Sequence, residues 1–380
     1  MKPNHPTFIC RPNYLVSRGA SVTWFCAVLA LAASSPASAA ELDPAIYVLV
    51  DTSGSMLMTP DGSQNTYGDG SSEHPHVAGL TSRFYMAKEA MRTVIDAYGE
   101  VRWGLARFKQ ASARNYLCSC SSEIPNNTSG CGGYGGLWHA QDDCRLCDLM
   151  SPYPDHDQPG THDRVCINYA GGVLAGCTDP ISEMPLIGAD ILVPLASANQ
   201  ASILKWINHQ ETDYGEAGYN SSLTPELQVD PELRASGGTP IGGSLLDLYT
   251  RLSTVDIGAD PLRGCRPYSI IVLTDGAESC NSDPVTRATQ LRQTPDLTRT
   301  CGTGCPPNST CVSNRCVYEV KTYVIAFAVA PNEFINCNDI AVAGGTSSAI
   351  PASNSADLVA AMAEIIADSI RTERCNGVDD

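Results

Sequence analysis

The chain has 380 residues, of which 43% are hydrophobic and 17% are charged, and its formal net charge is −17. This composition excludes an intrinsically disordered, collagen-like or coiled-coil protein. The excess of acidic over basic residues argues against binding to nucleic acid or to an anionic membrane through bulk charge. It suits a soluble protein that binds cations.

The first 40 residues have the pattern of a secretory signal peptide. Three basic residues precede an apolar run at residues 20–33, and the small residues Ala37-Ser-Ala39 follow it. The run is shorter than the roughly 20 residues that a membrane-spanning helix needs. We therefore expect cleavage near Ala40, no membrane span in the mature chain, and a secreted or cell-surface protein (periplasm or outer envelope in a Gram-negative source). The alternative is an uncleaved N-terminal anchor.

From Glu41 onward, strand-like and helix-like segments alternate. Strand-like segments lie at residues 45–50, 101–108, 191–195, 268–274 and 321–329. Helix-like segments lie at 87–98, 201–208, 241–252, 284–292 and 356–370. The continuous apolar run at 45–50 indicates a strand buried on both faces, and 268–274 is interpreted as a second buried strand. The alternation predicts an α/β fold with a mostly parallel sheet.

Two Cys-rich segments interrupt this alternation. Residues 112–185 show no clear periodicity and are interpreted as a disulfide-stapled insertion, and residues 300–317 as a smaller Cys-rich loop. Most of the 17 cysteines are expected in disulfides, as is usual in an exported protein. Within the insertion, a zinc site at Cys118, Cys120, Cys144 and Cys147 is the alternative. Residues 375–380 read as the start of a polar Cys/Asp-rich tail.

Three oxygen-rich loops are the strongest functional signal. Asp51-Thr-Ser53-Gly-Ser55 follows the first strand, Thr239 precedes the helix at 241–252, and Asp275 ends the strand at 268–274. Ligands of open α/β sheets bind beyond the carboxyl ends of the strands. Carboxylates and hydroxyls are hard oxygen ligands that suit Mg²⁺. The loops are therefore expected to converge on one metal site.

Weaker candidates for a second cation lie in the loop after the first motif, where a solvated loop is the favoured interpretation. These residues are Asp61, Asp69, Glu73, His74 and His76.

The set Asp51-x-Ser53-x-Ser55, Thr239 and Asp275 resembles the metal-ion-dependent adhesion site of von Willebrand factor type A (vWA) domains. The resemblance covers about residues 44–111 and 186–372, and the sequence looks most like secreted bacterial members of the type IV pilus tip-adhesin-like kind. It implies a doubly wound, Rossmann-like vWA domain over residues 41–374, interrupted by the Cys-rich insertion. It also implies one short antiparallel strand, at residues 191–195.

The resemblance further implies a role for each site residue. Ser53, Ser55 and Thr239 would contact the cation directly or through water. Asp51 and Asp275 would lie nearby and orient the hydroxyls. The cation would be Mg²⁺, with Mn²⁺ or Ca²⁺ as alternatives, and one coordination position would stay open for a partner's Asp or Glu carboxylate.

These observations favour a secreted or surface-displayed binding module rather than an enzyme. Its partner would be an extracellular protein or another surface ligand that offers a carboxylate. Two alternatives remain open: a structural envelope component in which the cation only holds loops together, and a hydrolase that uses the cation to activate water.

The strand at 268–274 separates the cysteines into two groups. Cys265 precedes this strand and Cys280 follows it, so they lie more than ~20 Å apart, well beyond the ~7 Å limit for a disulfide. Cys280, Cys337 and the insertion are expected at the metal face, and the remaining cysteines after the signal peptide at the opposite end. The metal-face group is odd in number, so we predict that it holds the unpaired thiol and that a disulfide staples the insertion beside the site.

Overall fold

The computed structural model describes residues 43–66, 79–109, 187–210 and 237–371, the backbone of three short strands between 117 and 168, and single residues at 70, 76, 177, 185, 232, 233 and 235. All of them belong to one compact unit, Ala40–Asp380. The expected signal peptide, most of the insertion and the tail at 375–380 lie outside the described residues. In the part of the chain that is described, no helix has both the length and the apolar character needed to cross a membrane.

A six-stranded sheet lies at the centre, with the strand order β12-β11-β7-β1-β2-β6. Its strands are β1 (Ala45–Val50), β2 (Arg102–Phe108), β6 (Ala189–Ala196), β7 (Tyr268–Thr274), β11 (Val320–Phe327) and β12 (Ile350–Ala352). All neighbouring strands are parallel except β2 and β6, which are antiparallel. The prediction of a mostly parallel sheet is confirmed, and the antiparallel strand expected at 191–195 is β6.

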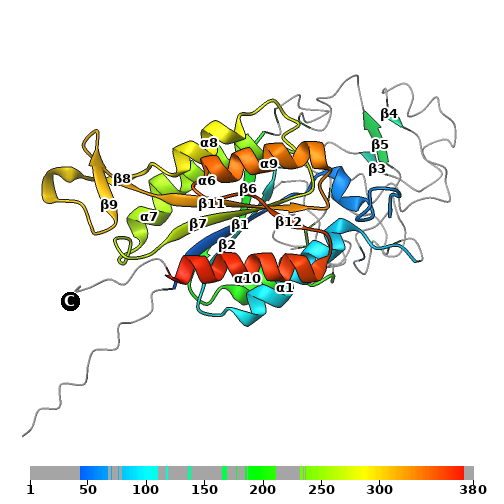
Figure 1. Cartoon of the computed structure of the whole chain (residues 1–380), viewed down its shortest axis with the longest axis horizontal. Coiled ribbons are helices and arrows are strands. Elements are labelled where there is room, and N and C mark those ends of the chain that lie inside the picture. The colour runs from blue at the N-terminus through cyan, green and yellow to red at the C-terminus, as the bar shows by residue number, and fades with distance from the viewer. Residues whose placement is uncertain are drawn as a thin grey trace, which may run out of the picture. The chain divides into compact units, whose positions relative to one another are not determined.

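Helices cover both faces of this sheet (Figure 1). One face carries α1 (Arg83–Ala97), α4 (Gln200–Leu204) with the short helix η4 (Lys205–Ile207), and α10 (Ser355–Arg371). The other face carries α6 (Ile241–Arg251), α8 (Pro284–Leu291) and α9 (Pro331–Ala343). After α6 the chain continues through a π-helical turn, η5 (Leu252–Asp256), into α7 (Ile257–Ala259).

The pleat of each strand divides the core between the two faces. In β1, Ile46, Val48 and Val50 pack towards α1 and α10, whereas Tyr47 and Leu49 pack towards α6 and its neighbours. Every residue of β1 and β7 is buried. Because both faces of the sheet are covered, these strands are apolar along most of their length rather than alternating between apolar and polar residues.

The segment at 300–317 is not the loop that the sequence analysis expected. β9 (Ser309–Val312) and β10 (Arg315–Tyr318) form a hairpin that joins β8 (Thr294–Thr300) in an antiparallel sheet of order β8-β10-β9, with the short helix η6 (Cys301–Thr303) between β8 and β9. Two disulfides, Cys301–Cys311 and Cys305–Cys316, cross-link this unit. Because disulfides rather than a hydrophobic core stabilise this small sheet, its sequence has no periodic apolar pattern from which the strands could be predicted.

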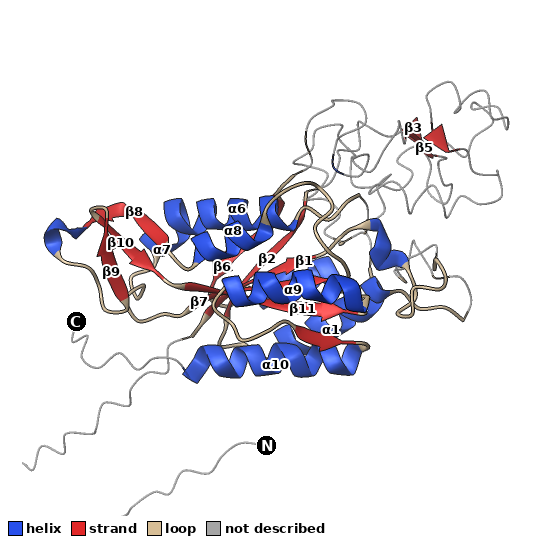
Figure 2. Cartoon of the chain, turned by 45° about the horizontal axis from the view of Figure 1, so that its top comes forward, coloured by secondary structure: helices blue, strands red, loops and turns tan. Residues whose placement is uncertain are grey.

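A third small sheet lies in the insertion, with the order β3-β5-β4. Its strands are β3 (Leu117–Cys118), β4 (Gly136–Leu137) and β5 (Val165–Asn168). Figure 2 shows the sheet of β8, β9 and β10 at one end of the central sheet, away from the turn that follows β1.

Candidate metal centre

The loop after β1 folds back on its own first carboxylate. Asp51 Oδ1 accepts a hydrogen bond of 2.7 Å from the backbone N–H of Ser53. Ser53 is the N-cap of η1 (Gly54–Leu57), a short 3₁₀ helix that two buried apolar residues anchor in the core. This turn places the hydroxyls of Ser53 and Ser55 side by side, with their Oγ atoms 2.9 Å apart.

The end of β7 brings a second carboxylate to the same place. β1 and β7 are parallel neighbours, and Val50 pairs with Leu273, so the residues that follow emerge at one edge of the sheet. Asp275 Oδ1 accepts a hydrogen bond of 2.8 Å from the hydroxyl of Ser55. Asp51 Oδ2 accepts one of 2.6 Å from the hydroxyl of Thr274. Direct contacts therefore join the first motif to the second carboxylate.

The loop before α6 contacts both of these loops through its backbone. The N–H of Gly54 donates to the carbonyl oxygen of Gly237 at 3.1 Å. The N–H of Thr239 donates to Ser279 Oγ at 2.8 Å, and the N–H of Ser279 donates to the carbonyl oxygen of Thr239 at 3.0 Å. The three loops thus converge at one edge of the sheet, as the sequence analysis expected.

Burial differs sharply across the centre. Asp51, Ser53, Thr239 and Asp275 are buried, whereas Ser55 is exposed. Burial, together with the nearby charge of Asp275, raises the pKa of the Asp51 carboxyl. The acidic groups therefore lie inside, and Ser55 marks the side that solvent reaches.

The sequence analysis missed one charged residue of this centre, Arg83. Its Nη1 lies 2.7 Å from Asp275 Oδ2, and its side chain is 11% exposed. Arg83 is the first residue of α1, 192 positions before its partner, and no local motif marks it. Only the tertiary fold brings the two together.

The residues present fit a hard divalent cation. In an octahedral site with metal–oxygen distances of about 2.1 Å, neighbouring ligand oxygens lie about 3.0 Å apart. The separations of 2.9 Å between Ser53 Oγ and Ser55 Oγ, and of 2.8 Å between Ser55 Oγ and Asp275 Oδ1, are close to that value. The donors are all oxygen atoms, which suits Mg²⁺ or Mn²⁺ rather than a soft metal.

The disulfides at this edge agree with the sequence analysis. Cys280, in the loop after Asp275, forms a disulfide with Cys177 of the insertion. Cys337 is the free cysteine among the described residues, and it lies buried with Sγ 3.9 Å from the carbonyl oxygen of Gly276. The insertion is therefore stapled beside the candidate centre, and a free thiol lies at the same face, as predicted. No disulfide joins Cys265 to Cys280.

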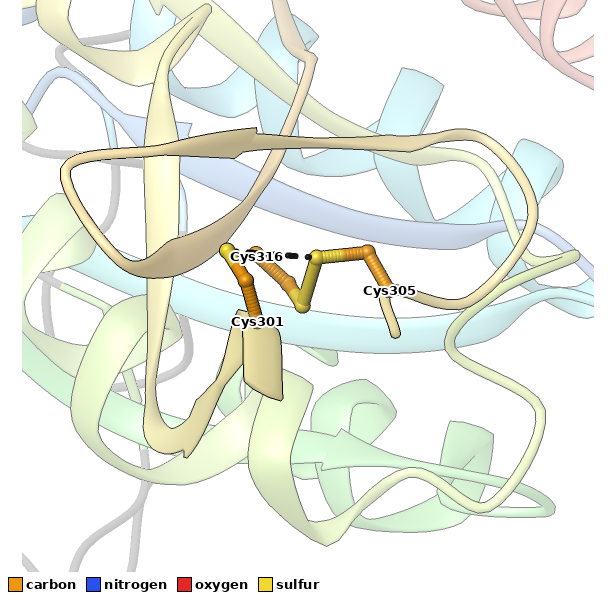
Figure 3. A group of neighbouring side chains, drawn as sticks. All are labelled: Cys301, Cys305 and Cys316. Atoms are coloured by element: carbon orange, nitrogen blue, oxygen red, sulfur yellow. Dashed lines mark hydrogen bonds between the residues drawn. A yellow bond between two sulfur atoms is a disulfide. The ribbon is translucent and has the colours of Figure 1, made fainter. Parts of the chain in front are cut away.

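A cluster of sulfur atoms near the opposite end of the sheet is not a second metal centre. Among the described residues, Cys301, Cys305 and Cys316 are the group whose ligand atoms lie close enough to share an ion, within 4.8 Å of one another (Figure 3). All three are in disulfides, and a metal requires thiolates.

The candidates for a second cation do not assemble in the described residues. Asp61 accepts hydrogen bonds from Thr59 and Ser63, and His76 contacts Ser82 instead. Asp69, Glu73, His74 and the side chains of the alternative zinc site at Cys118, Cys120, Cys144 and Cys147 lie outside the described residues.

Comparisons with known proteins give matches to solved structures alone. No family model matches the chain, and no curated protein matches it. The conserved hypothetical protein BatB from Bacteroides thetaiotaomicron is 12% identical, with a TM-score of 0.37, over 86% of this chain and 99% of its own. The PilB minor pilin from Streptococcus sanguinis is 12% identical, with a TM-score of 0.35, over 87% of this chain and 61% of its own. Proximal thread matrix protein 1 from the mussel byssus, with a zinc-occupied MIDAS motif, is 11% identical, with a TM-score of 0.33, over 87% of this chain and 45% of its own. The chain thus spans less than two thirds of the pilin and of the byssus protein.

Proposed function

We propose that this chain is a vWA-like binding module that holds a divalent cation, Mg²⁺ in the first place, and uses it to bind an Asp or Glu carboxylate of an extracellular partner. The cation would be held by the residues named from the sequence, Asp51, Ser53, Ser55, Thr239 and Asp275. The observation that carries this proposal is the row of three oxygen atoms on Ser53, Ser55 and Asp275, spaced for neighbouring octahedral positions and ending at an exposed residue.

A binding role is favoured over hydrolysis by the partners of the two carboxylates. Asp51 accepts hydrogen bonds from Ser53 and Thr274. Asp275 accepts from Ser55 and from Arg83. Since both carboxylates are engaged in holding the loops, neither is placed as a general base that would take a proton from water. The disulfides support a secreted or surface location, because such bonds persist in oxidising compartments.

The test is cation binding by a variant that cannot disturb the core. Ser55→Ala removes one exposed oxygen donor, and Ser63→Ala, at another exposed serine of the segment that follows β1, is the matched control. Isothermal titration of chelator-treated protein with MgCl₂ and with MnCl₂ is expected to show one ion per chain. Ser55→Ala should weaken the affinity for the cation by about 10-fold or more, and Ser63→Ala should leave this affinity unchanged.

A second arm tests the carboxylate. Acetate should bind to the Mn²⁺-saturated wild type and not to the chelator-treated protein. The proposal is wrong if millimolar Mg²⁺ and Mn²⁺ do not bind, or if Ser55→Ala binds them as the wild type does. If the cation binds and raises the unfolding temperature but acetate does not bind, the structural alternative replaces the adhesive one.

A further inference from the structure

Arg83 gives the candidate centre a permanent positive charge of its own. Its guanidinium donates to Asp275 Oδ2 at 2.7 Å, and the side chain of Asp275 is 0% exposed. Arginine stays charged at every pH at which a protein folds. The pair is also little screened by salt, because it is buried.

The backbone around Arg83 holds it in this position. Ser82 caps α1 by accepting a hydrogen bond from the N–H of Tyr85, and the N–H of Arg83 donates to the carbonyl oxygen of Met58 at 2.9 Å. The loop before α1 covers the guanidinium, since a Cβ atom at Gly62 would lie 3.1 Å from Arg83 Nη2. Arg83 is thus fixed to the first turn of a helix rather than carried on a free arm.

The two oxygens of Asp275 are divided between Arg83 and the hydroxyl row. Oδ2 takes the guanidinium, and Oδ1 takes the hydroxyl of Ser55, which itself contacts Ser53. The guanidinium of Arg83 and the hydroxyl of Ser55 therefore bind different oxygens of the Asp275 carboxylate. A cation held at the hydroxyls does not have to displace Arg83.

A count of formal charge gives the consequence. With both carboxylates ionised, as a bound dication requires, they and the guanidinium together carry one net negative charge, so the dication leaves the centre with one net positive charge. Without the guanidinium, the same dication would leave the centre neutral. In a buried site, where charges interact strongly, this difference acts on both the cation and the anion that follows it.

We propose that Arg83 weakens binding of the divalent cation alone and strengthens binding of an anionic ligand to the cation-loaded protein. The inference rests on the proposed function, and it deepens it by naming a residue that regulates the same site. Arg83 acts through Asp275 and through its charge, as a positioning residue that is not itself a ligand.

The experiment is a charge-matched set of variants, titrated first with MgCl₂ and then, in saturating MnCl₂, with acetate. Arg83→Gln makes the centre one unit more negative, Asp275→Asn makes it one unit less negative, and the double variant restores the wild-type charge. Arg92→Gln is the matched control, because Arg92 lies on α1 with its side chain 54% exposed. Thermal unfolding checks that each variant is folded.

The charge argument predicts a definite order of Mg²⁺ affinity. Arg83→Gln should bind Mg²⁺ about 10-fold more tightly than the wild type, within the range usual for coupled sites. The double variant should lie near the wild type, and Asp275→Asn should be weakest. Acetate should bind Arg83→Gln about 10-fold more weakly than the wild type, and Arg92→Gln should match the wild type in both titrations.

Three outcomes separate the possibilities. If Arg83→Gln binds both ligands as the wild type does, or loses both together, Arg83 is purely structural and the inference is wrong. If Arg83→Gln does not fold, the comparison of the double variant with Asp275→Asn decides, because the charge argument requires the double variant to bind Mg²⁺ more tightly. If the wild type itself binds no divalent cation, the proposed function fails first.

Discussion

The disulfide between Cys177 and Cys280 offers the sharpest test of how the insertion is tied to the fold. Its two cysteines are 103 positions apart, whereas those of the Cys301–Cys311 bond are 10 apart. In the chain-entropy description, a disulfide stabilises the native state by restricting the unfolded chain, and it does so more for longer loops. The two bonds should therefore differ in their contribution to stability.

The separations give the expected magnitudes. For a loop of about 100 residues the entropy lost by the unfolded chain corresponds to about 4.7 kcal/mol at 25 °C, and for a loop of about 10 residues to about 2.7 kcal/mol. Replacing both cysteines of a bond by serine should thus cost about 2 kcal/mol more for Cys177–Cys280 than for Cys301–Cys311. The remaining Cys305–Cys316 bond widens the gap, because it already restricts the shorter loop.

Urea unfolding followed by tryptophan fluorescence measures this difference. Trp103 and Trp206 are buried in the core on the α1 side of the sheet and report on global unfolding. Loss of the Cys177–Cys280 bond should also weaken Mg²⁺ binding, because Ser279, next to Cys280, holds the backbone of Thr239. Equal costs for the two bonds would refute the loop-length reasoning, and unchanged Mg²⁺ affinity would refute the link to the metal centre.

Two further predictions concern the sheet and its far end. Gly104→Ala should destabilise the protein by about 1–3 kcal/mol, because the added methyl would lie 2.3 Å from a ring carbon of Tyr47; the urea midpoint measures it. Burial alone would raise the pKa of Asp260, but hydrogen bonds from Tyr268 and the backbone of Leu262, with the charge of Arg266, outweigh it and lower the pKa. The stability that Asp260 contributes is therefore present above the unfolded pKa of about 4 and is lost as the pH falls below it. Between about pH 4 and pH 2, Asp260→Asn should thus lose less unfolding free energy than the wild type.

Each of these two predictions has a control. Gly302→Ala is the comparison for the sheet glycine, since an added methyl there would lie 3.9 Å from the hydroxyl of Thr300, and it should leave the urea midpoint unchanged. An equal shift in both variants would contradict the packing argument. For Asp260, the prediction is wrong if the unfolding free energy of the variant falls as steeply with decreasing pH as that of the wild type. Other carboxylates would then govern acid unfolding. Mg²⁺ affinity should be unchanged in this variant, because Asp260 lies at the end of the sheet where β7 begins, whereas the candidate metal site lies where β1 and β7 end.

The strands that position the centre were predictable because their burial is visible in the sequence. β1 and β7 are buried along their whole length. β1 is an uninterrupted apolar run and β7 a mostly apolar one, and they are followed by Asp51 and Asp275. In a parallel pair, those ends must meet at one edge. The helix α9 was missed for the opposite reason. Its buried residues are Cys337, Ile340 and Ala341, while Ile335 is 62% exposed, so the apolar pattern does not mark its inner face.

Arg83 shows what spacing along a chain cannot reveal. Four of the five candidate ligand residues follow the ends of β1 and β7, where topology fixes their position, but Arg83 begins a helix that packs across the sheet from α6, α8 and α9. Its contact with Asp275 depends on the packing angle of α1 and on the turn that precedes it. Such contacts have no periodic signature, because they depend on tertiary geometry rather than on local preference.

Local charge at the centre also bears on how an acidic partner could bind a chain with a net charge of −17. Repulsion between the chain and such a partner is screened beyond about 10 Å at 0.1 M salt, whereas buried charges at contact are not. If a dication is held at the hydroxyl row, the carboxylates of Asp51 and Asp275 are offset by the ion and by Arg83 together, and the exposed Ser55 lies where a partner's carboxylate would approach. The acidic surface would then discourage non-specific contact with acidic molecules, and the centre would remain the point where one carboxylate is attracted. Selectivity would come from that contrast in sign, which requires the guanidinium as well as the ion.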